Sequence, residues 1–126
     1  MNNLAAAKNA HGSRSQPSHV VLLSFPFDDL TANEKRRVPI MRAANLRGDF
    51  LAVQIISQPG YQGALVLEQD GFCLGFLPKK GFVRPDKWVT LNGSPVIGRT
   101  GRLIAEAFAR IREGVCVYVG CQNNNG

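Results

Sequence analysis

The stretch Gly63–Lys80, GALVLEQDGFCLGFLPKK, decides the fold that we expect from this sequence. Ala64–Leu67 is a short apolar run of the kind found in buried strands. Asp70-Gly71 suits a two-residue hairpin turn, because this dipeptide tolerates positive φ. Phe72–Leu77 then alternates along its length and places large side chains on one face, as a second strand does. We therefore predict an antiparallel hairpin whose chain leaves the sheet at two lysines.

Further strands are predicted on both sides of this hairpin. Compact apolar runs rich in β-branched and aromatic residues are typical of strands, and they occur at Val20–Phe25, Phe50–Ile56, Trp88–Leu91 and Val115–Cys121. Asn92-Gly93 predicts a second hairpin turn. Pro95 then places the return strand, residues 94–98, at a sheet edge, because proline cannot donate a ladder hydrogen bond.

Two helices are predicted, one short and one long. Thr31 and Glu34 match a capping box, and the short helical segment that follows them ends before Gly48. Thr100 can cap the long helix, residues 101–113, which carries an apolar stripe at helical spacing. Gly114 closes this helix at its C-terminal end.

The strands come in hairpins and do not alternate with helices, which argues against a doubly wound parallel sheet. We expect an α+β fold: a small antiparallel, barrel-like or strongly curved β-sheet with one long C-terminal helix and one short helical segment. The chain of 126 residues has the size of one domain. We expect that domain at residues 19–121, between a disordered N-terminal arm (1–18) and a disordered tail (122–126).

The composition bears on location and on the class of partner. No apolar run approaches the roughly 20 residues of a membrane span, and the N-terminus lacks the apolar segment of a secretory signal. We therefore expect a cytoplasmic protein. Fifteen Lys and Arg against nine Asp and Glu give a net charge of +6, which favours polyanionic partners if the charge gathers on one face. The alternative is a solvated surface that binds nothing acidic.

Residues suited to catalysis or metal binding are scarce. The cysteines, Cys73, Cys116 and Cys121, show no zinc-binding spacing and read as free thiols. His11 and His19 are the only histidines. No phosphate-binding glycine loop and no nucleophile elbow occurs. We expect no catalytic residues, no metal and no cofactor, and we interpret the protein as a binding module.

Tyr61 and the cationic clusters are the candidate binding residues. Tyr61 stands in a loop between two glycines, where it either covers one end of a barrel or stacks on a nucleobase. Basic residues precede and follow it in the sequence. The full candidate set for nucleic-acid binding is Tyr61, Gln62, Lys79, Lys80, Arg84, Arg47, Arg36 and Arg37.

Three short motifs resemble the HIRAN domain, a module of fork-remodelling helicases and of small proteins in bacteria and their mobile elements. LRGDFL (46–51) resembles that family's G-D-x-L motif at the start of a strand. ISQPGYQGALVL (56–67) is similar to REPxNPYDxNAVxV, and DGFCLGFLPK (70–79) is similar to dGxxlGYxPr. Ile104–Gly120 resembles the helix and closing strand that follow.

The resemblance implies a small modified β-barrel that captures single-stranded DNA at a free 3′ end. It implies that Tyr61 is the loop tyrosine that stacks on a base. Gln62 stands where the family has an aspartate, and Pro59 where it has an asparagine.

The leading hypothesis from the sequence is a non-enzymatic module that binds single-stranded or end-containing DNA. Tyr61 would stack on a base while lysine and arginine side chains contact phosphates. The alternative is a small accessory protein that binds and regulates another protein, such as an inhibitor or regulator encoded by a mobile element. Its interface would be an exposed apolar patch or a free strand edge, for example the strand after Pro95. An enzyme acting on nucleic acid is a third possibility.

Overall fold

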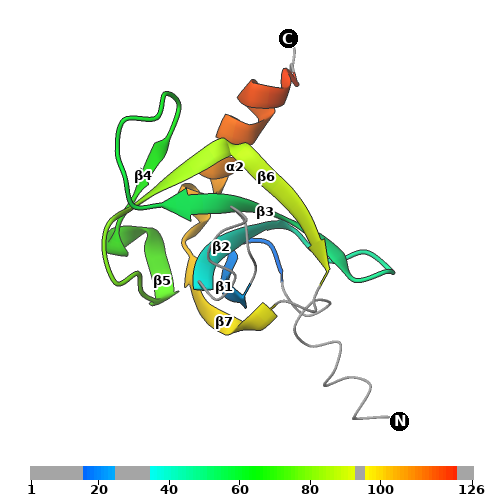
Figure 1. Cartoon of the computed structure of the whole chain (residues 1–126). Helices are drawn as coiled ribbons and strands as arrows, with labels where there is room; N and C mark the ends of the chain where they lie inside the picture. Colours follow the sequence, from blue (N-terminus) through cyan, green and yellow to red (C-terminus); the bar gives the residue numbers. More distant parts are fainter. Residues whose placement is uncertain (1–15, 25–34, 93–95, 122–126) are drawn as a thin grey trace.

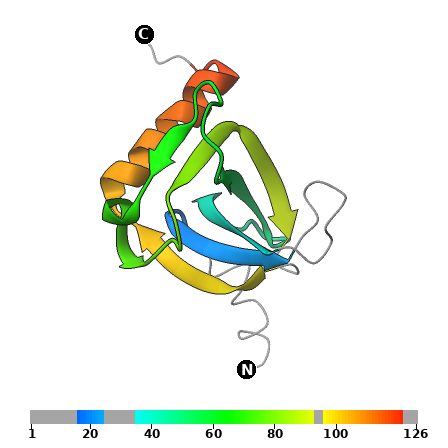
Figure 2. The same cartoon turned by 60° about the vertical axis from the view of Figure 1, so that its left-hand side comes forward.

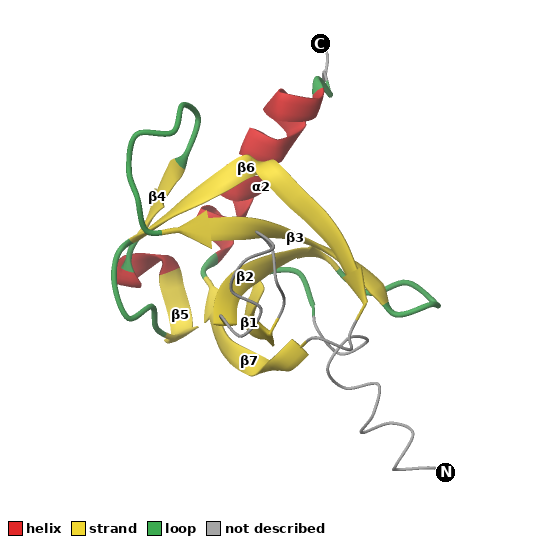
Figure 3. Ribbon diagram, viewed as in Figure 1, coloured by secondary structure: helices red, strands yellow, loops and turns green. Residues whose placement is uncertain are grey.

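A computed structural model describes residues 16–24, 35–92 and 96–121, which form a curled antiparallel sheet with one long helix at the C-terminal end (Figure 1). In chain order the strands and helices are β1 (His19–Ser24), β2 (Lys35–Arg42), β3 (Asp49–Ile56), β4 (Leu65–Leu67), the short 3₁₀ helix η1 (Gln69–Gly71), β5 (Phe72–Gly75), β6 (Gly81–Asn92), β7 (Val96–Leu103) and α2 (Ala105–Val119). Figure 3 shows how strands dominate the described part of the chain.

The seven strands run in the order β4-β6-β3-β2-β1-β7-β5, and every paired neighbour is antiparallel. The sheet curls around a common interior, with α2 along one side (Figure 2). This arrangement confirms the predicted α+β class, with a strongly curved antiparallel sheet and a long C-terminal helix.

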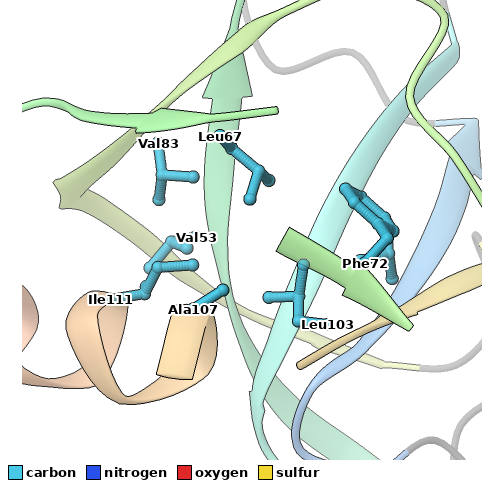
Figure 4. Packing of buried hydrophobic residues seen from close by; sticks show 8 residues of the cluster. Val53, Leu67, Phe72, Val83, Leu103, Ala107 and Ile111 are labelled. Carbon is cyan, nitrogen blue, oxygen red and sulfur yellow. The ribbon is translucent and has the colours of Figure 1, made fainter. Parts of the chain in front are cut away.

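The interior holds two clusters of buried apolar side chains. One joins α2 to the sheet and includes Val53, Val83, Leu103 and Ile111 (Figure 4). The other fills the curl between β1, β2 and β3 around Phe50. Each fully buried aliphatic or aromatic side chain contributes about 1.5–3 kcal/mol to folding, so the two clusters fix how the strands curve.

β6 is a single twelve-residue strand, of which the sequence predicted only Trp88–Leu91. Pro85 lies inside it, and the register with β3 shifts between Val53 and Gln54, whose partners are Trp88 and Arg84. The bulge removes Pro85 from the ladder, which is how a strand accommodates a residue without an N–H.

The predicted hairpin over residues 63–80 is wrong. β4 pairs with β6, and β5 pairs with β7, so these two short strands lie at opposite edges of the sheet. Gln69–Gly71 turns as the 3₁₀ helix η1 and directs the chain from one edge to the other. The alternation over Phe72–Leu77 also misled us, since Phe72 is buried but Phe76 is largely exposed.

The predicted boundaries of the long helix are wrong at both ends. Thr100 belongs to β7, and the helix begins at Ala105. Gly114 lies within the helix, where an added Cβ would come 2.8 Å from Cγ of Pro85. The helix continues through the segment predicted as a closing strand and ends at Gly120, whose φ of 80° suits glycine.

Two other secondary-structure predictions are wrong within the described residues. The short helix expected before Gly48 is replaced over residues 35–42 by strand β2, and its capping pair Thr31 and Glu34 lies outside the described residues. The strand after Pro95 is not a sheet edge, because β7 lies between β1 and β5. Pro95 and Gly93, like the terminal segments 1–15 and 122–126, lie outside the described residues. Among the described helices, none is long and apolar enough to cross a membrane.

Candidate functional site

Three strand ends meet at one place on the sheet. β2 and β3 are antiparallel, so the start of β2 lies beside the end of β3. β6 is antiparallel to β3 on its other side, and Phe82 pairs with Ile56 at this same end. Basic residues open β2 and immediately precede β6. The topology therefore gathers cationic segments that are about forty residues apart in the sequence.

A cavity of about 440 Å³ lies at this junction. Its walls combine five cationic side chains with hydroxyl, amide and apolar groups: Lys35, Arg36, Arg37, Lys79, Lys80, Ser57, Gln58, Tyr61, Ile55, Ile56, Leu77, Pro78 and Gly81. None of these lining residues carries a carboxylate. Cations gathered around one cavity bind a phosphate better than the same charges spread over a surface.

Arg37 is one of two partly buried arginines that line this cavity. Its backbone pairs with Leu22 of β1, which holds the residue rigidly in the sheet. Its Nε atom is buried and has no hydrogen-bond partner among the described residues. A buried donor left unpaired costs about 1–3 kcal/mol. Arg37 also lines the cavity, so an oxyanion bound there would lie beside its guanidinium group.

Lys80 pairs with Glu68, at 3.4 Å from Nζ to Oε2. Both side chains are about half exposed, at 53% and 50%. Ion pairs at this exposure contribute about 0–1 kcal/mol, so a phosphate could recruit Lys80 at little cost.

Tyr61 lies at the rim of the cavity, 44% exposed. The guanidinium of Arg84 stacks over its ring at 4.1 Å from the centroid. Asp86 holds that guanidinium with both carboxylate oxygens, a contact that lowers the pKa of Asp86 and raises the pKa of Arg84. Tyr61 therefore stacks on Arg84, whose guanidinium is held in place by Asp86.

The structure brings five of the eight predicted site residues to the cavity wall: Tyr61, Lys79, Lys80, Arg36 and Arg37. Arg84 is not part of the wall but supports Tyr61. Gln62 does not line the cavity. Arg47 lies in the turn between β2 and β3, at the opposite end of both strands, where its carbonyl accepts a hydrogen bond from Asn92.

Sequence analysis missed Lys35, Ser57 and Gln58 as site residues. Ser57 and Gln58 follow the last residue of β3 directly. A polar pair at the end of an otherwise apolar strand is a recognisable signal for a site at a sheet edge, but it gains meaning only once β2 is placed alongside.

His19 and the cysteines lie away from the cavity wall. His19 is buried, and burial, followed by the charges of Arg99 and Arg102, lowers its pKa. Within residues 16–24, 35–92 and 96–121, no three His, Cys, Asp or Glu side chains gather as metal ligands.

Comparison with known structures relates this fold to the MazF group. The chain superposes on a MazE-MazF structure from Deinococcus radiodurans with a TM-score of 0.65 and 20% identity, covering 85% of this chain and 96% of the other. An endoribonuclease from a Mycobacterial species, solved in complex with its cognate antitoxin, gives a TM-score of 0.63 and 16% identity, covering 86% and 95%. MazF alone from D. radiodurans gives 0.59 and 18%, covering 83% and 96%. The chain has the MazF fold.

No protein-family model matches the chain, and no curated protein resembles it significantly in sequence. The likeness to MazF structures is therefore carried by architecture rather than by sequence.

The resemblance to the HIRAN domain is wrong, because the architecture is that of the MazF structures. Its motifs were short, and the two that flank Gln69–Gly71 belong to strands at opposite sheet edges. The predictions of a non-enzymatic module and of DNA as the partner are corrected with it. One of the proteins that share this fold is an endoribonuclease, an enzyme that acts on RNA. Two of the similar structures also contain a second protein.

Proposed function

We propose that this protein is an endoribonuclease that cleaves single-stranded RNA in the cavity at the start of β2. The observation that carries the proposal is a cavity lined by five cationic residues and by no carboxylate residue, in which one lining residue, Arg37, has an unpaired Nε. The fold shared with an endoribonuclease agrees with it. A phosphodiester is an anion of suitable chemistry for such a cavity.

RNA carries its own nucleophile, which answers the objection that the chain has no nucleophile–base set. In the proposed reaction, the 2′-hydroxyl oxygen attacks the adjacent phosphorus, and the bond from phosphorus to the 5′ oxygen breaks. The products are a 2′,3′-cyclic phosphate and a 5′-hydroxyl, which receives a proton as the 2′-hydroxyl loses one. The protein has to position the phosphate and stabilise the charge that builds on its oxygens, which is the main task in phosphoryl transfer.

The lining residues divide this task between them. Arg37 would hold the phosphate oxygens in a fixed direction, since its backbone pairs with Leu22 of β1. Lys79 and Lys80 would add mobile positive charge as the transition state forms. The Ser57 hydroxyl can both donate and accept a hydrogen bond, so it would bridge a reacting oxygen and the solvent.

Tyr61 would select single-stranded RNA. Proteins read unpaired RNA by stacking its bases on aromatic rings. The Tyr61 ring is exposed at the cavity rim, and Arg84 supports it from behind. A base stacked there would position its neighbouring phosphate over the cations.

We also propose that a protein partner controls this activity. The favouring observation is that one of the similar structures holds MazF with MazE, and another holds an endoribonuclease with its cognate antitoxin. This retains the sequence-based alternative of a chain that binds another protein. Candidate edges for such a partner are β4 and β5, the two ends of the sheet.

The test is cleavage of three matched oligonucleotides: all-RNA, all-DNA of the same sequence, and RNA with a single 2′-deoxy substitution at the mapped cleavage position. Mass spectrometry of the products should show cyclic phosphate and 5′-hydroxyl ends from the RNA only. The single deoxy substitution should abolish cleavage at that bond alone. Equal cleavage of DNA, or no cleavage of any RNA in a pool of varied sequences, would refute the proposal.

A further inference from the structure

Two cysteines lie at the C-terminal end of α2, one on each side of the residue that ends the helix. Cys116 lies in the last turn of the helix, and Cys121 follows Gly120, the residue that ends it. The backbone N–H of Cys121 donates to the carbonyl of Cys116 at 2.9 Å, and that of Gly120 donates to Val117 at 3.2 Å. With Gly120 in the left-handed conformation, this is a Schellman helix end.

The helix end brings the two cysteine side chains together. In a Schellman motif, the side chains at these two positions commonly contact each other across the turn. The neighbouring thiol of Cys116 is the main cause that raises the pKa of Cys121. Cys121 is exposed and Cys116 is half-buried, so a dissolved oxidant can reach the pair.

Covalent geometry supports a bond between them. The 2.9 Å hydrogen bond joins the nitrogen of Cys121 to the oxygen of Cys116. Standard bond lengths and angles then hold the two Cα atoms within about 6.8 Å. Disulfides span about 4.4–6.8 Å between Cα atoms.

We propose that Cys116 and Cys121 form an oxidative modification site that closes to an intrachain disulfide across the end of α2. The oxidant is a small-molecule disulfide of the glutathione class. The thiolate of one cysteine attacks a sulfur of the oxidant, which releases one thiolate and leaves a mixed disulfide. The second cysteine attacks the protein sulfur of that mixed disulfide and releases the other thiolate. Two protein thiols are oxidised, one disulfide is reduced to two thiols, and both protons end on the released thiols.

Cys73 provides an internal control. It lies on β5, where its thiol donates a hydrogen bond to the carbonyl of Leu103 at 3.7 Å. Among the described cysteines it has no cysteine neighbour in a shared turn. The same oxidant should therefore leave Cys73 reduced or carry it no further than a mixed disulfide.

The disulfide would stiffen an exposed apolar turn. Val117, Tyr118 and Val119 lie between the two cysteines and are 71%, 61% and 52% exposed. A short covalent ring restricts the opened states of this turn. We expect amide hydrogen exchange over residues 117–121 to slow by on the order of tenfold on oxidation. Exchange in the sheet should not change.

The test treats the folded full-length protein with oxidised glutathione and compares it with the variants Cys73→Ser, Cys116→Ser and Cys121→Ser. Wild type and Cys73→Ser should each lose two hydrogens in intact mass and yield a linked Cys116–Cys121 peptide. Cys116→Ser and Cys121→Ser should instead keep glutathione on the remaining cysteine of the pair. Persistence of all free thiols in wild type, stable glutathione on Cys121, or disulfides between chains would overturn the proposal. None of these readouts depends on RNA cleavage.

Discussion

The guanidinium carbon of Arg84 lies 4.1 Å from the centroid of the Tyr61 ring. Asp86 holds the same guanidinium, with Nε donating to Oδ1 at 3.0 Å. A tyrosine in a loop between glycines would otherwise turn freely. Stacking on an anchored cation orients its ring at the cavity rim, and cation–π contacts of this kind contribute about 0.5–2 kcal/mol. The arrangement leads to predictions for both substrate binding and stability.

The first prediction concerns Tyr61. Replacement by Ala removes the stacking surface, which contributes about 1–3 kcal/mol per base. We expect Tyr61→Ala to lower kcat/KM for RNA by roughly 10- to 100-fold, mostly through KM, measured with a fluorogenic oligonucleotide. Tyr61→Phe keeps the aromatic face and should stay within about threefold of wild type. Equal losses in both variants would mean that the phenol hydroxyl, and not stacking, is what matters.

The second prediction concerns acid stability. The hydrogen bond from Arg84 lowers the pKa of Asp86 in the folded protein. A lowered carboxyl pKa stabilises the fold above the unfolded value of about 3.9, and this contribution is lost as the pH falls from there through the lower folded pKa. Asp86→Asn should therefore lower Tm at neutral pH, and the gap to wild type should narrow as the pH is reduced below about 4.

Asp70→Asn serves as the control for this measurement, because Asp70 is an exposed carboxylate in η1. Its Tm should follow that of wild type over the same pH range. If the gap between wild type and Asp86→Asn stayed constant down to about pH 2, the pairing of Asp86 with Arg84 would not be the cause.

The third prediction concerns the contact between α2 and β6. Glycine to alanine inside a helix normally stabilises by about 1 kcal/mol. At Gly114, however, the new methyl group would come 2.8 Å from Cγ of Pro85, in a ring that cannot turn away. Overpacking costs about 1–3 kcal/mol. We expect Gly114→Ala to destabilise the protein by about 1 kcal/mol in urea unfolding, whereas Glu113→Ala at the next position should change stability by less than about 0.5 kcal/mol. A stabilised Gly114→Ala would show that helix and strand are less tightly packed.

The sequence predicted those parts of the fold that local patterns specify. The apolar runs predicted β1 and β3 to within one residue at each end. The apolar stripe predicted that a long C-terminal helix exists, but not the bounds of α2. Strand partners were not predicted, because pairing depends on distant segments. Asp70-Gly71 has good turn chemistry, yet β4 pairs with β6 and β5 with β7, at opposite edges of the sheet.

The end of α2 shows tertiary packing overriding local preference. Val115–Val119 is rich in β-branched residues, which favour strands. It is nevertheless helical, because it continues a helix whose Gly114 fits against Pro85 and whose Ile111 is buried in the core. No short-range pattern contains that information.

The sequence predicted several residues of the candidate site from their chemistry, but it did not predict how the fold brings them together. Tyr61 and the lysines after β5 could be recognised as binding groups from their chemistry alone. The burial of the Arg37 Nε and the proximity of Ser57 arise only when β2 pairs with β3. The inference that no enzyme was present is overturned by the fold shared with an endoribonuclease. It rested on the missing nucleophile–base set, and the proposed reaction needs none because an RNA substrate would supply its own nucleophile.

The most direct measurement for the central claim compares Arg37→Ala with Arg42→Ala in single-turnover RNA cleavage. Both variants lose one arginine from β2, but Arg42 is exposed at the far end of the strand and does not line the cavity. We predict that Arg37→Ala lowers the cleavage rate by about 10²- to 10³-fold, the usual loss for a preorganised donor at the reacting phosphate, whereas Arg42→Ala stays within about threefold of wild type. Equal rates for the two variants would contradict the assignment of the cavity as the site of cleavage.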